Sequence, residues 1–150
     1  MSQSLCNILV HIVFSTKDRY PFLRDEVRPE LHAYGATVLK NDNCPTLLMN
    51  SMSDHVHILC ALSKNLAVCK LIKQFKVTTS EWIKTKGGML TKFHWQSGYG
   101  AFSVSQSNVP AVRQYIAEQE NHHKRMTFQD EFRALLRKHQ VEFDERYVWD

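Results

Sequence analysis

The 150-residue sequence predicts an α+β fold in which a β-α-β-β-α-β order is followed by two further helices. Three observations support this prediction. Short segments rich in β-branched and aromatic residues are typical of strands. Longer segments between them carry apolar residues at helical spacing. Clusters of glycine, proline, asparagine and aspartate separate the segments, as turns require.

The strands are expected in four segments. Residues 7–16 are apolar on both faces, which is typical of a central strand. Residues 45–52 and 55–62 form two apolar runs separated by a serine-aspartate pair, which predicts a hairpin. Residues 101–105 alternate between apolar and polar side chains and predict a fourth strand.

The helices are expected between and after these strands. Residues 25–40 and 66–84 have apolar positions at helical spacing. An asparagine and a proline predict the start of a helix over 108–123, because asparagine caps well and proline is tolerated in a first turn. A last helix is expected at 128–139, and residues 89–100 are expected to be irregular. The first six elements match the ferredoxin-like motif, in which the first and third strands lie side by side.

The bulk composition indicates one ordinary globular domain spanning residues 1–150. Apolar residues make up 43% of the chain and charged residues 23%. No apolar run approaches the roughly 20 residues that cross a bilayer, and the first residues lack the features of a signal peptide. We therefore expect a cytoplasmic protein without a membrane partner.

The positive charge is concentrated in one segment. The chain carries +4 overall, but residues 64–112 alone contain seven lysines and one glutamate, a net +6. A concentrated basic surface is typical of proteins that bind a polyanion. A solvated helix face that keeps the protein soluble is an equally good interpretation of the charge alone.

Two short patterns carry candidate chemistry. His55 and His57 flank one residue of a predicted strand, so both side chains point to the same face and can share a metal ion. Tyr115 and Gln119 lie four residues apart on a predicted helix and share one of its faces. Each pattern also has a structural interpretation, as hydrogen-bonded sheet histidines and as a tyrosine packed in the core.

Together the patterns resemble the HUH endonucleases, and more closely the single-tyrosine IS200-like transposases of small insertion sequences, including the REP-associated tyrosine transposases. The resemblance runs in the expected order through four stretches of the chain: Val10–Lys17, Ser53–Leu59, Trp95–Ser105 and Tyr115–His123. Each stretch alone is unspecific, and the joint match is specific.

The resemblance implies a role for each matching residue. Tyr115 would be the nucleophile, and His55, His57 and Gln119 would hold a divalent metal, Mg²⁺ or Mn²⁺. It further implies a ferredoxin-like core, a homodimer and single-stranded DNA with hairpin or palindromic ends as substrate. Cleavage would give a 5′-phosphotyrosine and a free 3′-OH, and rejoining of strands would complete DNA transposition or recombination.

Further residues are candidates for the same site. His122 shares the face of Tyr115 and is either a base or DNA contact, or a capping or surface histidine. His11 lies on the strand expected beside His57, where it would either support a ligand or fill the core. Candidate DNA contacts, each as readily explained by packing, are Lys17, Arg19, Lys70, Lys73, Lys76, Lys84, Lys86, Trp95 and Tyr99.

Two other functions remain open. A catalytically silent module of the same fold would bind hairpin DNA or RNA, although the strands lack the aromatic pattern of RNA-recognition modules. A replication-initiator nuclease of the wider HUH group is disfavoured, because many of those proteins are larger and carry two tyrosines.

Overall fold

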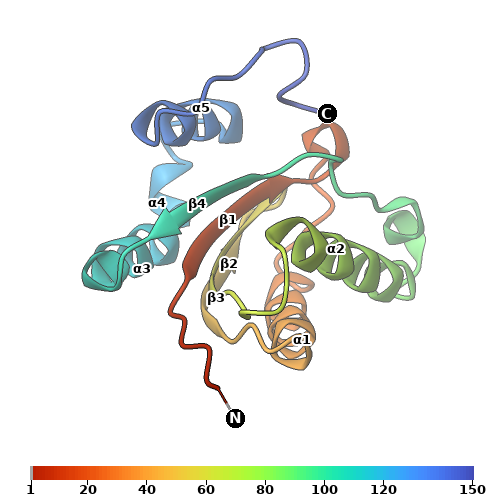
Figure 1. Cartoon of the computed structure of the whole chain (residues 1–150). Coiled ribbons are helices and arrows are strands. Elements are labelled where there is room, and N and C mark those ends of the chain that lie inside the picture. The colour runs from red at the N-terminus through yellow and green to blue at the C-terminus, as the bar shows by residue number, and fades with distance from the viewer. Residues whose placement is uncertain (1) are drawn as a thin grey trace.

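A computed structural model describes residues 2–150 of the chain (Figure 1). The strands β1 (Leu9–Ser15), β2 (Thr46–Ser51), β3 (His55–Ala61) and β4 (Gly100–Val104) form one antiparallel sheet in the order β2-β3-β1-β4. The predicted α+β fold is therefore confirmed, including the central position of the first and third strands.

Helices cover both faces of this sheet. The helices α1 (Arg28–Asn41) and α2 (Val68–Lys84) pack on one face. The helices α3 (Val109–Ala117), α4 (Gln119–His122) and α5 (Phe128–Lys138) lie on the other, as Figure 1 shows. Short 3₁₀ turns at Lys17–Arg19, Gly88–Lys92 and Gln106–Asn108 connect these elements.

The single helix expected over 108–123 is wrong, because the structure divides it at Glu118 into α3 and α4. Glu118 has φ −95° and ψ 21°, outside the helical range. In a continuous helix the carbonyl of Ile116 would accept the N–H of Glu120, but it accepts the side-chain amide of Asn50 at 2.8 Å instead. The side chain of a distant strand thus competes with the helix ladder.

The alternation of side chains along β1 divides the core in two. Val10, Ile12 and Phe14 pack against α1 and α2 in the larger apolar cluster. His11 and Val13 point to the opposite face, under α3 and α5. This explains why β1 is apolar on both sides. Across residues 2–150, no helix is long and apolar enough to cross a membrane.

Candidate active site

The histidines of β3 lie on the sheet face that α3, α4 and α5 cover. His55 and His57 are both 0% exposed. They pair across the sheet with Ser15 and Val13 of β1. Because they are two residues apart on one strand, their imidazoles project to the same side, as the sequence predicted.

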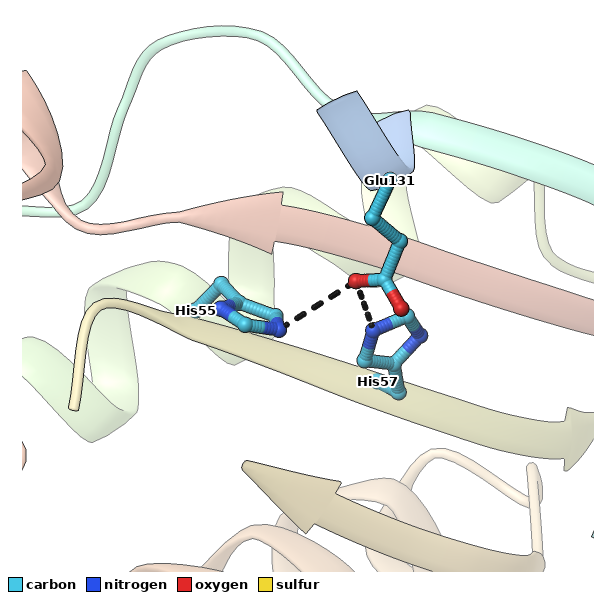
Figure 2. Close-up of side chains that lie close together, drawn as sticks. All are labelled: His55, His57 and Glu131. Carbon is cyan, nitrogen blue, oxygen red and sulfur yellow. Dashed lines mark hydrogen bonds and ion pairs between the residues drawn. The ribbon is translucent and has the colours of Figure 1, made fainter. Parts of the chain in front are cut away.

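A carboxylate from the C-terminal helix meets these two imidazoles (Figure 2). Glu131 of α5 places Oε1 3.0 Å from His57 Nε2 and 3.4 Å from His55 Nε2. The ligand atoms of the three residues lie within 4.8 Å of one another. Two imidazoles and one carboxylate at this spacing form a group that can hold a metal ion.

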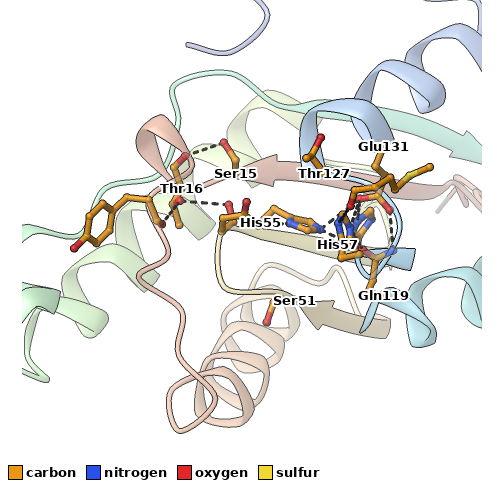
Figure 3. A network of polar contacts seen from close by, with 12 residues as sticks. Ser15, Thr16, Ser51, His55, His57, Gln119, Thr127 and Glu131 are labelled. Carbon is orange, nitrogen blue, oxygen red and sulfur yellow. Dashed lines mark hydrogen bonds and ion pairs between the residues drawn. The ribbon is translucent and has the colours of Figure 1, made fainter. Parts of the chain in front are cut away.

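Gln119, at the start of α4, joins the same cluster, as Figure 3 shows. Its Oε1 lies 3.2 Å from His55 Nε2, and its Nε2 donates to Glu131 Oε2 at 3.1 Å. His123 Nε2 lies 3.0 Å from Gln119 Oε1 and 3.1 Å from Glu131 Oε1. The structure therefore brings Gln119 to the histidine pair despite the break in its helix.

Tyr115 reaches the cluster from α3. Its hydroxyl donates a hydrogen bond to Glu131 Oε2, and its ring lies 5.9 Å from the ring of His57. Tyr115 also packs against the apolar cluster that includes Val109 and Ile116. The side chain thus combines an apolar body in the core with a hydroxyl at the polar cluster.

The histidines are oriented by groups behind them. His11 Nε2 lies 2.8 Å from His57 Nδ1, and the two rings stack with centroids 5.1 Å apart. Asp54 Oδ1 lies 2.7 Å from His55 Nδ1. These contacts fix the ring orientations and leave Nε2 of both His55 and His57 facing Glu131, which is the usual arrangement behind metal-binding histidines.

Burial and contacts within the cluster shift the pKa values of its members. Burial disfavours the imidazolium of His55, but hydrogen bonds to Asp54 and Glu131 outweigh burial and raise its pKa to about 9. Burial lowers the pKa of His57, and it lowers that of His11 to about 3. Burial opposes the charge of Glu131, yet hydrogen bonds from the histidines hold the pKa of this carboxyl far below its usual range.

The surroundings of Tyr115 make its hydroxyl harder to ionise. Its burial and the negative charge of Glu131 raise the pKa of its hydroxyl well above the ordinary value of 10. The hydroxyl therefore stays protonated next to an ionised carboxylate. The structure thus shows the hydroxyl as a hydrogen-bond donor to the Glu131 carboxylate.

Sequence reasoning missed Glu131 and His123. A signal for Glu131 was present, because it interrupts an apolar stripe of α5 formed by Phe128, Phe132 and Leu135 at helical spacing. A buried acidic side chain on such a stripe needs polar partners. His123 also carried a signal, because it lies four residues after Gln119 and so shares the helix face on which Tyr115 and Gln119 lie.

Two of the candidate DNA contacts have polar partners within the chain. Lys76 Nζ donates to the carbonyls of Gln96, Ser97 and Gly98 at 2.8, 3.2 and 2.7 Å. Trp95 is only 8% exposed, and its Nε1 donates to Thr79 at 3.0 Å. These bonds give both side chains a role in the fold, and Lys76 remains partly exposed.

The remaining candidates lie nearer the surface. Lys70, Lys73 and Lys84 belong to α2, on the face of the sheet opposite His55. Lys86 forms an ion pair with Glu30, and Arg19 lies over the ring of Trp149. Lys17 is exposed, and Tyr99 is 40% exposed. His122 faces Tyr115 with ring centroids 4.7 Å apart, and its buried Nε2 has no hydrogen-bond partner among residues 2–150.

Solved structures share this fold. A candidate transposase from Deinococcus radiodurans superposes with a TM-score of 0.62 at 20% identity, covering 79% of this chain and 98% of that one. A REP-associated tyrosine transposase bound to a REP hairpin superposes with a TM-score of 0.59 at 12% identity, covering 82% and 74%. No curated protein matches the chain.

The sequence itself matches a family model. The model described as "Transposase IS200 like" matches residues 4–119, which include His55, His57, Tyr115 and Gln119. Glu131 and the rest of α5 lie beyond the matched region. The match covers most of the chain, and the chain belongs to the IS200-like transposase family.

Proposed function

We propose that this transposase cleaves and rejoins single-stranded DNA through Tyr115, with the help of a divalent metal. One observation carries the proposal. The tyrosine hydroxyl, the two imidazoles of β3 and the amide of Gln119 all contact the same carboxylate, Glu131. A weak nucleophile, a proton acceptor and candidate metal ligands thus occupy one site.

The donor set fits Mg²⁺ or Mn²⁺. The residues that would hold the ion are His55, His57 and Glu131, with Gln119 as a further oxygen donor. A carboxylate supplies the negative charge that two neutral imidazoles and an amide lack. When bound, the ion would offset the charge of a phosphate's non-bridging oxygens and so favour attack by an oxygen nucleophile.

The two oxygens of Glu131 support separate tasks. Oε1 faces His55 and His57, whereas Oε2 accepts the Tyr115 hydroxyl. In the proposed step, His55 and His57 no longer donate to Glu131, so its carboxylate becomes a better proton acceptor. Tyr115 Oη then bonds to phosphorus and its proton passes to Oε2. The P–O3′ bond breaks, the departing oxygen takes a proton and becomes a 3′-OH, and the 5′ phosphate stays on the tyrosine. Attack by a 3′-OH on this phosphotyrosine reverses the step and joins strands.

Substrate entry requires a movement of α5. His55, His57, Gln119 and Glu131 are each at most 1% exposed, so a phosphate cannot reach them in this arrangement. Glu131 is the contact that α5 makes with the histidines, and a cation held between them would replace these direct hydrogen bonds with bonds to the ion. We propose that α5 then moves outward only far enough to admit a phosphate, while Glu131 still reaches the ion.

The proposed substrate carries a hairpin. The similar structure of a REP-associated tyrosine transposase bound to a REP hairpin supports this choice. Lys70, Lys73 and Lys84 of α2 offer cations on the far face of the sheet for a hairpin stem. A homodimer is proposed from the family resemblance, and analytical ultracentrifugation would test it.

The deciding experiment uses labelled hairpin oligonucleotides with single-stranded flanks, with Mg²⁺, with Mn²⁺ and with EDTA. We expect a metal-dependent covalent protein–DNA adduct on denaturing gels, lost in Tyr115→Phe. Tyr99→Phe is the matched control, because this exposed tyrosine lies outside the cluster. Hairpin binding without an adduct under every metal condition would replace the enzyme with a silent hairpin-binding module.

A further inference from the structure

A cavity of about 380 Å³ opens beside Tyr115, on the side away from the β3 histidines. It lies between β4, α3 and α5, and Tyr115, His122 and Glu131 form part of its wall. Its volume falls in the range of about 300–1,000 Å³ that is usual for small-ligand pockets. The metal and nucleophile chemistry described above does not use this space.

The walls of the cavity suit a flat, mainly apolar ligand. Aliphatic side chains, including Val112 and Leu135, line it. The rings of Tyr115, His122 and His139 also line it. His139 is held from behind by stacking on Phe102, with centroids 4.3 Å apart. Planar rings bind well against such surfaces, because stacking tolerates any flat π system.

The polar atoms of the cavity call for a ligand with hydrogen-bonding edges. His122 Nε2 is buried without a partner, which is costly unless a ligand supplies one. The side chain of Asn108 lines the same space. Lys138 also lines the cavity and is exposed, so its positive charge can pair with a negatively charged group of the ligand. A purely hydrocarbon ligand would leave these groups unused.

The location of the cavity indicates which ligand it would bind. Tyr115 and Glu131 line the cavity and also belong to the histidine cluster, so a phosphate attacked by the tyrosine hydroxyl would lie next to the cavity. We propose that the cavity takes up the unstacked base of a nucleotide next to the cleaved phosphate. This inference rests on the proposed function and deepens it, because the cavity then adds base selectivity at the cleavage position.

The test uses the four deoxynucleoside 5′-monophosphates as probes and NMR of isotope-labelled histidine side chains as the readout, with His122→Gln to assign the signal. We expect at least one nucleotide to shift the His122 signal at millimolar concentration. Ala134→Leu, which fills the cavity from an exposed position of α5, should weaken that binding about tenfold. Ala33→Leu, at an exposed position of α1 outside the cavity, should leave it unchanged.

Ala111→Leu provides a second filled cavity from α3, should Ala134→Leu fail to fold. Covalent adduct formation is measured on the same preparations. Nucleotide binding that both filled variants weaken supports the pocket, even if no adduct forms and the cleavage proposal falls. Absence of binding, or binding that neither filled variant weakens, overturns the pocket even if the adduct forms normally.

Discussion

The two faces of the sheet are built from the same strands and differ in what they bury. Beneath α1 and α2, side chains such as Phe14, Ile58 and Phe75 form a continuous apolar cluster. Beneath α3, α4 and α5, the same strands bury His11, His55 and His57 among polar partners. The face beneath α1 and α2 therefore gains stability from apolar burial. The face beneath α3, α4 and α5 buries polar groups, which destabilise the fold unless they are hydrogen-bonded.

Substitutions on the two faces should therefore have different effects on stability and on the site. Loss of an apolar side chain beneath α2 should lower stability and leave the chemistry of the site intact until the protein unfolds. Changes beneath α5 should alter metal binding and proton transfer more than stability.

Phe75→Ala tests the apolar face. Phe75 is 1% exposed and packs edge-on against Phe14, with ring centroids 6.0 Å apart. Its truncation should lower the free energy of unfolding by about 3–5 kcal/mol, measured by urea denaturation. Val77→Ala, at a 50% exposed position of the same helix, should change it by less than about 0.5 kcal/mol. Equal losses in both variants would refute the assignment of this face to stability.

Glu131→Gln tests the polar face. The amide keeps the size of the side chain and removes the charge that faces His55 and His57. We expect Mn²⁺ binding, measured by isothermal titration calorimetry, to weaken at least about tenfold. Glu145→Gln is the control, because this carboxylate pairs with Arg133 outside the site. Unchanged Mn²⁺ affinity in Glu131→Gln would remove Glu131 from the metal ligands.

Acid should destabilise the α1 side through His32. Burial, and secondarily Arg28, lower the pKa of His32 to about 4, below the 6.5 of an unfolded chain. Neutral His32 therefore stabilises the fold above pH 6.5, and this contribution is lost as the pH falls towards 4. The loss should be roughly 1–2 kcal/mol, because the side chain is partly exposed.

Urea denaturation between pH 4 and pH 7 measures this contribution. His32→Gln should reduce the pH dependence without abolishing it, because buried His11 and His57 also resist protonation, whereas His94→Gln, at an exposed histidine, should leave it unchanged. An identical slope in His32→Gln and the unmodified protein would contradict the assignment.

The smallest effect is expected at the surface of α2. If Lys70 and Lys73 contact a hairpin stem, replacing both with alanine should reduce the slope of log affinity against log salt by about 2. Fluorescence anisotropy with a hairpin oligonucleotide measures this slope. Lys76→Ala should leave the slope unchanged and lower stability instead, because its ammonium is bound to three backbone carbonyls. An unchanged slope in the double variant would move the stem to another surface.

Sequence periodicity predicted most of the fold, because strand alternation and helical spacing are local properties. The apolar β1 and the hairpin of β2 and β3 needed no knowledge of distant residues. The break at Glu118 was out of reach, since it depends on Asn50, which is 66 residues from the Ile116 carbonyl that it contacts. A competing side chain from another element leaves no mark on the local pattern.

The site was predictable to the extent that its spacing is local. The His55 and His57 pair and the Tyr115 and Gln119 pair each lie within a single segment, and the structure brings the two pairs together around Glu131. Glu131 itself comes from a helix outside the recognised pattern. Lys76 and Trp95 show the converse limit, because a lysine or tryptophan suited to DNA contact is equally suited to packing.

Because the helix is broken at Glu118, Tyr115 on α3 and Gln119 on α4 are attached to the sheet separately. Arg113 donates to the carbonyl of Leu47 at 2.7 Å and Asn50 holds that of Ile116, so α3 is fastened to the β2 edge. Gln119 begins a new helix and rests on His55. The position of Tyr115 is therefore set by β2, and that of Gln119 by β3. A substitution that loosens one of these attachments need not displace the other residue, whereas a continuous helix would couple the two positions.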